Sequence, residues 1–150
     1  MGCLLGLSWF AVSDAPYVPT KTVRIRKALI AAGLKKDEIF WELGSGDGRV
    51  VLEAARMGAK SYGIEQSWIR VLLSRWKAKK QNLPNAKFIH GNIFKKDFFS
   101  ADIVYIFLLP KAVQRLEPLL KKNLKKGARV ITQTFHFKNW KPHKKILVTD

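Results

Sequence analysis

Cysteine is almost absent from this 150-residue sequence. The single cysteine, Cys3, excludes a disulfide within the chain, a zinc site built from paired cysteines and a cysteine nucleophile inside the domain. No internal repeat and no low-complexity tract interrupts the sequence. The length and the 47% content of hydrophobic residues predict one globular domain that buries a core of its own.

Acidic residues are scarce. Asp and Glu number 11 against 28 Lys and Arg, which gives a net charge of +17 and an isoelectric point near 10.3. Such a charge attracts polyanions and anionic membrane surfaces. Basic clusters lie at residues 77–80, 121–126 and 141–145. They would suit the phosphates of a nucleic acid, the head groups of an anionic membrane, or simply solvated helix faces, and the sequence leaves these alternatives open.

The sequence also lacks an apolar run of membrane-spanning length. Residues 3–12 (CLLGLSWFAV) are apolar over ten positions, whereas a bilayer needs about 20. No basic stretch precedes them as in a signal peptide, and Gly6 stands where a myristoylation pattern needs Ser or Thr. Three interpretations remain: a helix on a membrane or a partner, a transmembrane segment shortened by a misplaced start, or a strand or helix packed on the core. We therefore divide the chain into an apolar segment, 1–15, and a domain, 16–150.

Strand and helix patterns alternate along that domain. Strands are expected at residues 39–43, 61–65, 86–90, 102–109, 128–135 and 144–150. Helices are expected after Thr20, after the glycines at 44–48, after Ser67 and from Pro110, with Pro118 dividing the last one into two pieces. In the third helix, an apolar stripe is expected to face the core: Ile69, Leu72, Leu73 and Trp76. This alternation predicts an α/β sandwich with a mainly parallel sheet.

A glycine-rich, acidic loop follows the first of these strands, in FWELGSGDGRVVLEAA (40–55). Arg49 stands where the dinucleotide fingerprint needs its last glycine, and a Gly-Lys-Ser/Thr ending is absent, so neither nucleotide loop fits. Glu42 and Asp47 suit a ligand that carries an ammonium and a sulfonium better than one that carries a pyrophosphate. Glu65, 23 residues after Glu42, has the spacing of an acid that accepts both hydroxyls of a ribose. A plain strand-to-helix turn is the alternative.

These residues resemble the class I methyltransferases that use S-adenosylmethionine. ELGSGDG is similar to the first motif of that superfamily and GIE to the acidic motif after it. Further segments, PYVPT, GIEQSWIRVLLSR, FIHGNIF, IFLLP and LKKGARVITQTF, follow in the order found in one branch of it. That branch holds the small archaeal protein lysine methyltransferases and the mitochondrial enzymes that methylate the adenine nucleotide translocase and the ATP synthase c subunit. The resemblance covers about residues 16 to 142.

The resemblance implies a Rossmann-like seven-strand methyltransferase sandwich that binds S-adenosylmethionine and no metal. The chain ends after a sixth expected strand, which leaves open whether the sheet lacks its last strand. Gly44 and Gly46 would let the backbone approach the methionine part of the cofactor. The remaining cofactor residues that the resemblance implies are Glu42 and Asp47 near the ammonium, Glu65 on the ribose, Asn92 on the adenine edge, Ile64 and Ile93 on the ring faces, and Tyr17 and Thr20 from the N-terminal arm.

The resemblance also implies that the methyl acceptor is a lysine of a protein substrate. An aromatic slot would desolvate that lysine, with core packing as the alternative role of each candidate residue: Tyr17, Phe107, Pro110, Phe135 and Trp140. RNA or another nucleic acid is the alternative acceptor, although FLLP (107–110) stands where amino-methylating nucleic-acid enzymes usually carry Asn/Asp-Pro-Pro-Tyr/Phe. A non-catalytic cofactor-binding module is a third interpretation. We expect a cytoplasmic enzyme at the inner face of a membrane, which the N-terminal segment and the basic face would contact.

Overall fold

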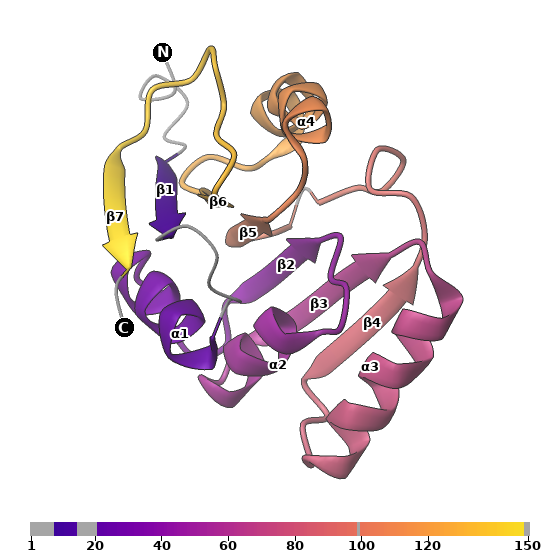
Figure 1. The fold of residues 1–150 in the computed structure, drawn as a ribbon. Coiled ribbons are helices and arrows are strands. Elements are labelled where there is room, and N and C mark those ends of the chain that lie inside the picture. The colour runs from indigo at the N-terminus through magenta and orange to yellow at the C-terminus, as the bar shows by residue number, and fades with distance from the viewer. Residues whose placement is uncertain (1–7, 15–20, 99, 149–150) are drawn as a thin grey trace.

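A computed structural model describes residues 8–14, 21–98 and 100–148, and it has a central sheet with helices on both faces (Figure 1). The strands are β1 (Ser8–Asp14), β2 (Ile39–Leu43), β3 (Lys60–Glu65), β4 (Ala86–His90), β5 (Ile103–Ile106), β6 (Arg129–Gln133) and β7 (Lys144–Val148). The helices are α1 (Thr22–Ala31), α2 (Arg49–Arg56), α3 (Trp68–Lys80) and α4 (Pro110–Asn123).

Alternate residues of the central strands face opposite layers. In β2, Phe40 packs in the cluster that includes α1 and α2, whereas its neighbour Trp41 packs in the cluster that includes α4. Tyr105 and Val104 of β5 divide in the same way. This follows from the two-residue period of a strand. Helices therefore cover both faces, as Figure 1 shows, and the predicted α/β sandwich is confirmed.

The described part of the sheet contains seven strands in the order β4-β3-β2-β5-β6-β1-β7, and every pair is parallel. No strand follows β7 within the described residues. The place between β6 and β7 is taken by β1, which comes from the other end of the chain. The sheet therefore reaches seven strands by a route that the sequence did not predict.

The N-terminal segment is a strand of this sheet over residues 8–14. Ala11 is in register with Thr132 of β6 on one side and with Lys145 of β7 on the other. Three interpretations of residues 3–12 were open, and the structure shows a strand over residues 8–12. The expected division at residue 15 therefore falls just after a strand of the domain. Residues 1–7 lie outside the described part. Within that part, no helix is both long and apolar enough to cross a membrane. A short apolar run suits a buried strand as well as a helix, so hydropathy alone could not decide.

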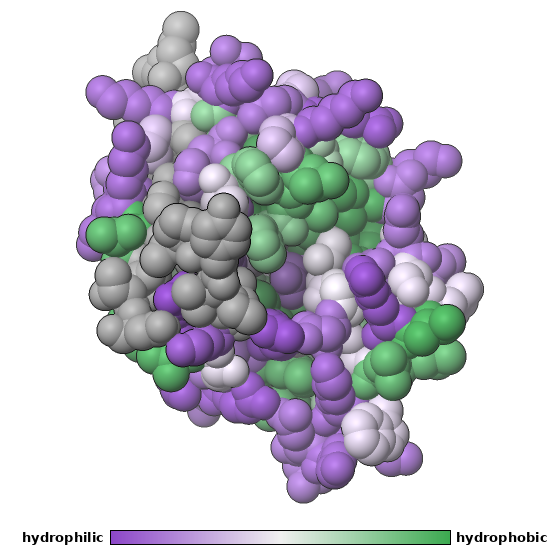
Figure 2. Space-filling view, in the orientation of Figure 1, coloured by the Kyte–Doolittle hydropathy of each residue, from purple (hydrophilic) through white to green (hydrophobic). Residues whose placement is uncertain are grey.

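The predicted orientation of α3 is wrong. The side chains that α3 buries are Val71, Ser74 and Ala78, whereas the expected apolar stripe is exposed to solvent, from 52% at Leu73 to 72% at Ile69. Figure 2 shows hydrophobic side chains gathered on the outer side of α3. Small side chains on the inner face let the helix lie close to the loop before α2, because a Cβ at Gly48 would stand only 2.8 Å from Ser74 Oγ. The larger apolar residues are consequently directed outward.

The predicted break in the fourth helix is also wrong. α4 runs without interruption through Pro118, which is exposed. Proline removes one hydrogen bond of a helix, but Val113, Leu116 and Leu120 pack into the same core cluster on both sides of it. Burial of this apolar face keeps the helix continuous.

Gly48, where α2 begins, allows a test of the packing between α3 and the loop. Gly48 has a φ of 84°, and a Cβ there would lie 2.8 Å from both Phe88 and Ser74. Gly127 has the same φ of 84° but no atom within 4 Å of such a Cβ. We expect Gly127→Ala to destabilise the fold by about 1–2 kcal/mol through backbone strain alone. Gly48→Ala should cost about 1–3 kcal/mol more through overpacking, as measured by urea unfolding. Equal losses in the two variants would contradict the close packing.

Candidate cofactor and active site

A cavity of about 840 Å³ opens at the carboxyl ends of the central strands. Residues that end or directly follow β2, β3, β4, β5 and β6 line it, together with the beginning of α4. The lining residues are Glu42, Gly44, Ser45, Gly46, Asp47, Arg49, Val50, Ile64, Glu65, Gln66, Arg70, Gly91, Asn92, Ile93, Phe94, Phe107, Leu108, Ala112, Arg115 and Gln133. In open α/β sheets this edge is where ligands bind, and the volume is within the range of small-molecule sites.

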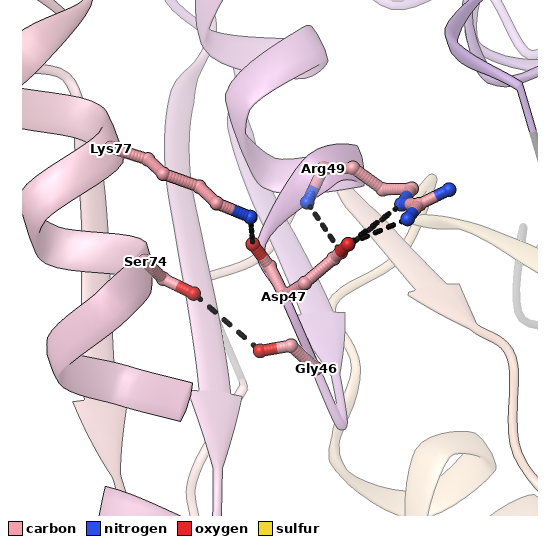
Figure 3. Close-up of polar contacts among 5 residues, drawn as sticks. All are labelled: Gly46, Asp47, Arg49, Ser74 and Lys77. Atoms are coloured by element: carbon pink, nitrogen blue, oxygen red, sulfur yellow. Dashed lines mark hydrogen bonds and ion pairs between the residues drawn. The ribbon is translucent and has the colours of Figure 1, made fainter. Parts of the chain in front are cut away.

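The glycine loop is held from behind by α3. Ser74 Oγ lies 3.5 Å from the carbonyl oxygen of Gly46, and Lys77 Nζ donates to the carbonyl oxygen of Asp47 at 3.1 Å (Figure 3). A Cβ on Gly46 would meet no protein atom within 4 Å, although the residue has a φ of 54°. The space at Gly46 is therefore open to a ligand, and the loop that borders it is fixed.

The carboxylate of Glu65 is oriented by two backbone N–H groups. Gly46 N donates to Oε2 at 2.9 Å, and Ser67 N donates to Oε1 at 3.0 Å. The side chain is buried and ends β3 at the cavity wall. Each carboxylate oxygen keeps a further lone pair, so both can accept from a ligand hydroxyl in the same fixed orientation.

Glu42 carries a buried acceptor without a partner. Its side chain is 5% exposed, and Oε2 makes no hydrogen bond. Burial raises the pKa of the Glu42 carboxyl well above its ordinary value of 4.5, and the charges of Asp47 and Glu65 raise this pKa further. An unpaired carboxylate in such a place is costly unless a cation or a donor meets it. The group therefore fits the positively charged part of a ligand.

Asp47 has a partner in the protein itself. Arg49 donates to both carboxylate oxygens, with Nη2 at 2.7 Å from Oδ2 (Figure 3). This hydrogen bonding is the main cause that lowers the pKa of Asp47 below its ordinary value. A ligand ammonium would have to share Asp47 with Arg49, so Glu42 is the acid with more capacity for a new partner.

The other end of the cavity offers an amide and apolar surfaces. Asn92 Oδ1 accepts from Phe94 N at 2.9 Å, which orients the amide and leaves a lone pair of that oxygen. Ile64 and Ile93 line the same cavity. Two aliphatic side chains with an oriented amide are suited to a flat heterocycle that presents an amino group at its edge.

Most of the predicted cofactor residues come together here. The cavity brings together Glu42, Gly44, Gly46, Asp47, Ile64, Glu65, Asn92 and Ile93. Their roles toward the cofactor remain predictions, and Tyr17 and Thr20 lie outside the described residues.

The predicted lysine slot is only partly assembled. Phe107 lines the cavity, whereas Pro110 begins α4 without lining it. Phe135 packs against the core cluster that includes α4. Trp140 is buried, 5.1 Å from the ring of Phe137 and stacked on it. Phe135 is partly buried and Trp140 is buried in this structure, because the chain after β6 folds back over α4. Their role toward a substrate lysine stays a prediction.

Several cavity residues were missed from the sequence. Arg49 and Arg70 are in the first turns of helices that follow the ligand-facing strands, and Arg115 lies on α4 with its guanidinium 3.8 Å from the ring centre of Phe94. Gln133 is the last residue of β6 and is hydrogen bonded to Tyr105. Gln133 could have been predicted from its position at a strand end. The arginines could not, because basic residues are common throughout this sequence.

The parallel sheet, the acidic glycine loop and the oriented carboxylate of Glu65 are the features of a class I methyltransferase that uses S-adenosylmethionine. The residues of the cavity fit that cofactor. Glu42 Oε2 has no hydrogen-bond partner and can meet a cationic group, and the space beside Gly46 is open to the ligand.

Comparisons with known proteins agree with this class. The model of the ANTKMT methyltransferase domain matches residues 42–144. A protein-lysine N-methyltransferase of Saccharolobus islandicus (strain REY15A) is 34% identical over 142 residues, which are 93% of this chain and 88% of that protein. The human ATP synthase c-subunit lysine N-methyltransferase is 33% identical over 128 residues, 85% of this chain and 54% of its own length. The chain belongs to the ANTKMT methyltransferase domain family, which confirms the resemblance found in the sequence.

Solved structures show the same fold with a related ligand. An RNA methyltransferase from Salinibacter ruber, crystallised with S-adenosyl-L-homocysteine, has a TM-score of 0.80 and 34% identity, and 84% of each chain is covered.

The chain spans most of the archaeal relative and between 51% and 60% of the lengths of the animal relatives that it matches.

The raised pKa of Glu42 leads to a pH-dependent affinity. In the free protein Glu42 keeps a proton at pH values where an ordinary carboxyl is ionised, and a bound cation favours the ionised form. Cofactor binding should therefore release a proton, and affinity should rise with pH until the raised pKa of Glu42 in the free protein is passed. Calorimetry in buffers of different ionisation enthalpy measures this proton.

The variants Glu42→Gln and Asp97→Asn separate this effect from other carboxyl groups. Glu42→Gln should abolish the proton release, whereas Asp97→Asn, at an exposed acid outside the cavity, should keep it. Proton release that persists in Glu42→Gln would contradict the assignment.

Proposed function

We propose that the protein transfers a methyl group from S-adenosylmethionine to a lysine side chain of a protein substrate. The observation that carries the proposal is the 34% identity to the protein-lysine N-methyltransferase of Saccharolobus islandicus, because the match covers 88% of that relative. The cavity supports the proposal with an acidic, fixed cofactor end and a partly apolar second end.

When bound, S-adenosylmethionine supplies an electrophilic methyl carbon on a positively charged sulfur. The contribution of this chain is to bind and orient. Glu65, held by Gly46 N and Ser67 N, would hold the ribose, and Glu42 would face the cationic part of the cofactor. Fixed alignment of two reactants supplies on the order of 7–11 kcal/mol of the barrier of such a displacement.

The acceptor lysine must lose its proton before it can attack. A lysine with its ordinary pKa of about 10.4 is uncharged in about one molecule of 2,500 at pH 7. Phe107, Leu108 and Ala112 form an apolar side of the cavity and disfavour the ammonium by desolvation. This desolvation lowers the pKa of an entering lysine.

RNA is the second candidate substrate, and one observation favours it. The Salinibacter ruber neighbour with a TM-score of 0.80 is described as an RNA methyltransferase, and the net charge of +17 suits a polyanion. The residues after β5, FLLP, lack the amide and the terminal aromatic with which amino-methylating nucleic-acid enzymes hold a flipped base. Protein lysine therefore remains the first proposal.

Labelled S-adenosylmethionine added with the protein to a host lysate tests the substrate class. Label should enter material that survives nuclease and is lost with protease, and hydrolysis should return methylated lysine. Glu65→Ala serves as the control for background label, because it removes the ribose acid. Label that disappears with ribonuclease and survives protease would replace the lysine proposal by the RNA one.

Phe107 and Leu109 provide a matched test of the apolar end. Both follow β5 and are exposed, at 46% and 73%, but only Phe107 lines the cavity. We expect Phe107→Ala to reduce kcat/KM for the protein substrate about 3- to 30-fold and to leave cofactor affinity unchanged. This factor corresponds to the cation–π energy between a desolvated ring and a methylammonium. Leu109→Ala should stay within about twofold of the wild type. Equal effects of the two substitutions would remove Phe107 from the slot.

A further inference from the structure

The outer face of α3 is an apolar surface that the described part of the chain leaves uncovered. We define it by the residues Trp68, Ile69, Leu72, Leu73 and Trp76, which are 53%, 72%, 57%, 52% and 58% exposed. They recur at three- and four-residue intervals and therefore form one stripe along the helix. Figure 2 shows hydrophobic side chains, in green, at the edge of the molecule where α3 lies. Single exposed apolar residues need no explanation, but a continuous stripe marks an interaction surface.

Basic residues flank the α3 outer face, and α3 contains no acidic residue. Arg75, Lys79 and Lys80 are exposed, and Arg75 lies over the ring of Trp68. Arg70 and Lys77 are directed at the cavity and the glycine loop instead. Lys80 Nζ lies 4.9 Å from the ring centre of Trp76, so a cation stands directly at the apolar stripe. Lys87 of the neighbouring edge strand β4 is exposed as well. The face thus combines tryptophan and aliphatic side chains with a rim of one charge.

We propose that the α3 outer face docks on a lipid bilayer that contains anionic head groups. An interfacial helix of this kind buries its aliphatic and tryptophan side chains at the head-group boundary, while its lysines and arginines contact the lipid charges. The net charge of +17 supplies long-range attraction to the same surface.

Charge and chemistry disfavour two other occupants. A second copy of the chain would bring two basic rims together, which like-charge repulsion opposes. A nucleic acid could meet the rim with its phosphates and stack on the two tryptophans, but Ile69, Leu72 and Leu73 between them are aliphatic and offer neither hydrogen bonds nor aromatic faces. An anionic bilayer can contact the basic rim through its head groups and bury the apolar stripe at the same time.

Docking through α3 would also place the cofactor cavity near the membrane. Arg70 belongs to the first turn of α3 and lines the cavity, so the cavity lies beside one end of the α3 outer face. This route differs from the contact expected through residues 3–12, because residues 8–12 are part of the sheet.

Co-sedimentation with vesicles tests the proposal on the full chain. The wild type should bind vesicles of phosphatidylcholine with phosphatidylserine, bind pure phosphatidylcholine much less, and lose binding as salt is raised. The double variant Leu72→Gln and Leu73→Gln should lower partitioning at least about tenfold. The matched control, Val23→Gln with Ile30→Gln, removes two residues of α1 that are 59% and 61% exposed and should change partitioning less than about twofold.

A second pair of variants tests the rim. Lys79→Gln with Lys80→Gln should weaken binding to anionic vesicles more than Lys122→Gln with Lys126→Gln, although both pairs remove the same charge from exposed positions. The proposal is overturned if the wild type stays in the supernatant with both vesicle types, or if the Leu72 and Leu73 variant binds as the α1 control does. It is also overturned if that variant changes only a dimer seen in sedimentation velocity, or only RNA binding, while vesicle binding is unchanged.

Discussion

The close approach of α3 to the glycine loop is the constraint on which most of this molecule depends. Gly48 lies so near Ser74 and Phe88 that a single methyl group would collide with both. The loop can follow this path because α3 presents small side chains to it and contributes Ser74 and Lys77 as partners of its carbonyl groups. With its carbonyl groups directed at α3, the loop turns the N–H of Gly46 toward Glu65. One packing contact thus arranges the cofactor end of the cavity and determines which face of α3 is left to solvent.

Several of the few acidic residues are buried. Glu42, Glu53, Glu65 and Glu117 are buried, so four of the 11 acids contribute little to the surface. The surface is consequently more basic than the composition alone suggests, while the cavity is acidic at its cofactor end. This separation lets one small domain hold a cationic cofactor inside and present a cationic exterior to its surroundings.

The sequence was informative where function depends on local spacing. The glycine loop and Glu65 could be predicted because their separation is fixed by one strand, one helix and a second strand, all contiguous in the chain. The orientation of α3 could not be predicted, because periodicity finds an apolar stripe but does not show whether that stripe or the small residues beside it face the sheet. The place of β1 in the sheet could not be predicted for a related reason: its partner strands β6 and β7 are distant in sequence, and only the tertiary fold shows which segments meet.

The position of β1 has a consequence for the order of events during synthesis. β1 is made before the other described strands, but its partners, β6 and β7, are the last two of them, and Ser8 is in register with Arg129. While the protein emerges from a ribosome, β2 to β5 can pair as each one leaves the exit tunnel, whereas β1 must wait for β6. Contacts of such long range slow folding. The half of the sheet that β1, β6 and β7 form is therefore completed after the half that β2 to β5 form, and β1 stays without its partner strands while the residues between them are made.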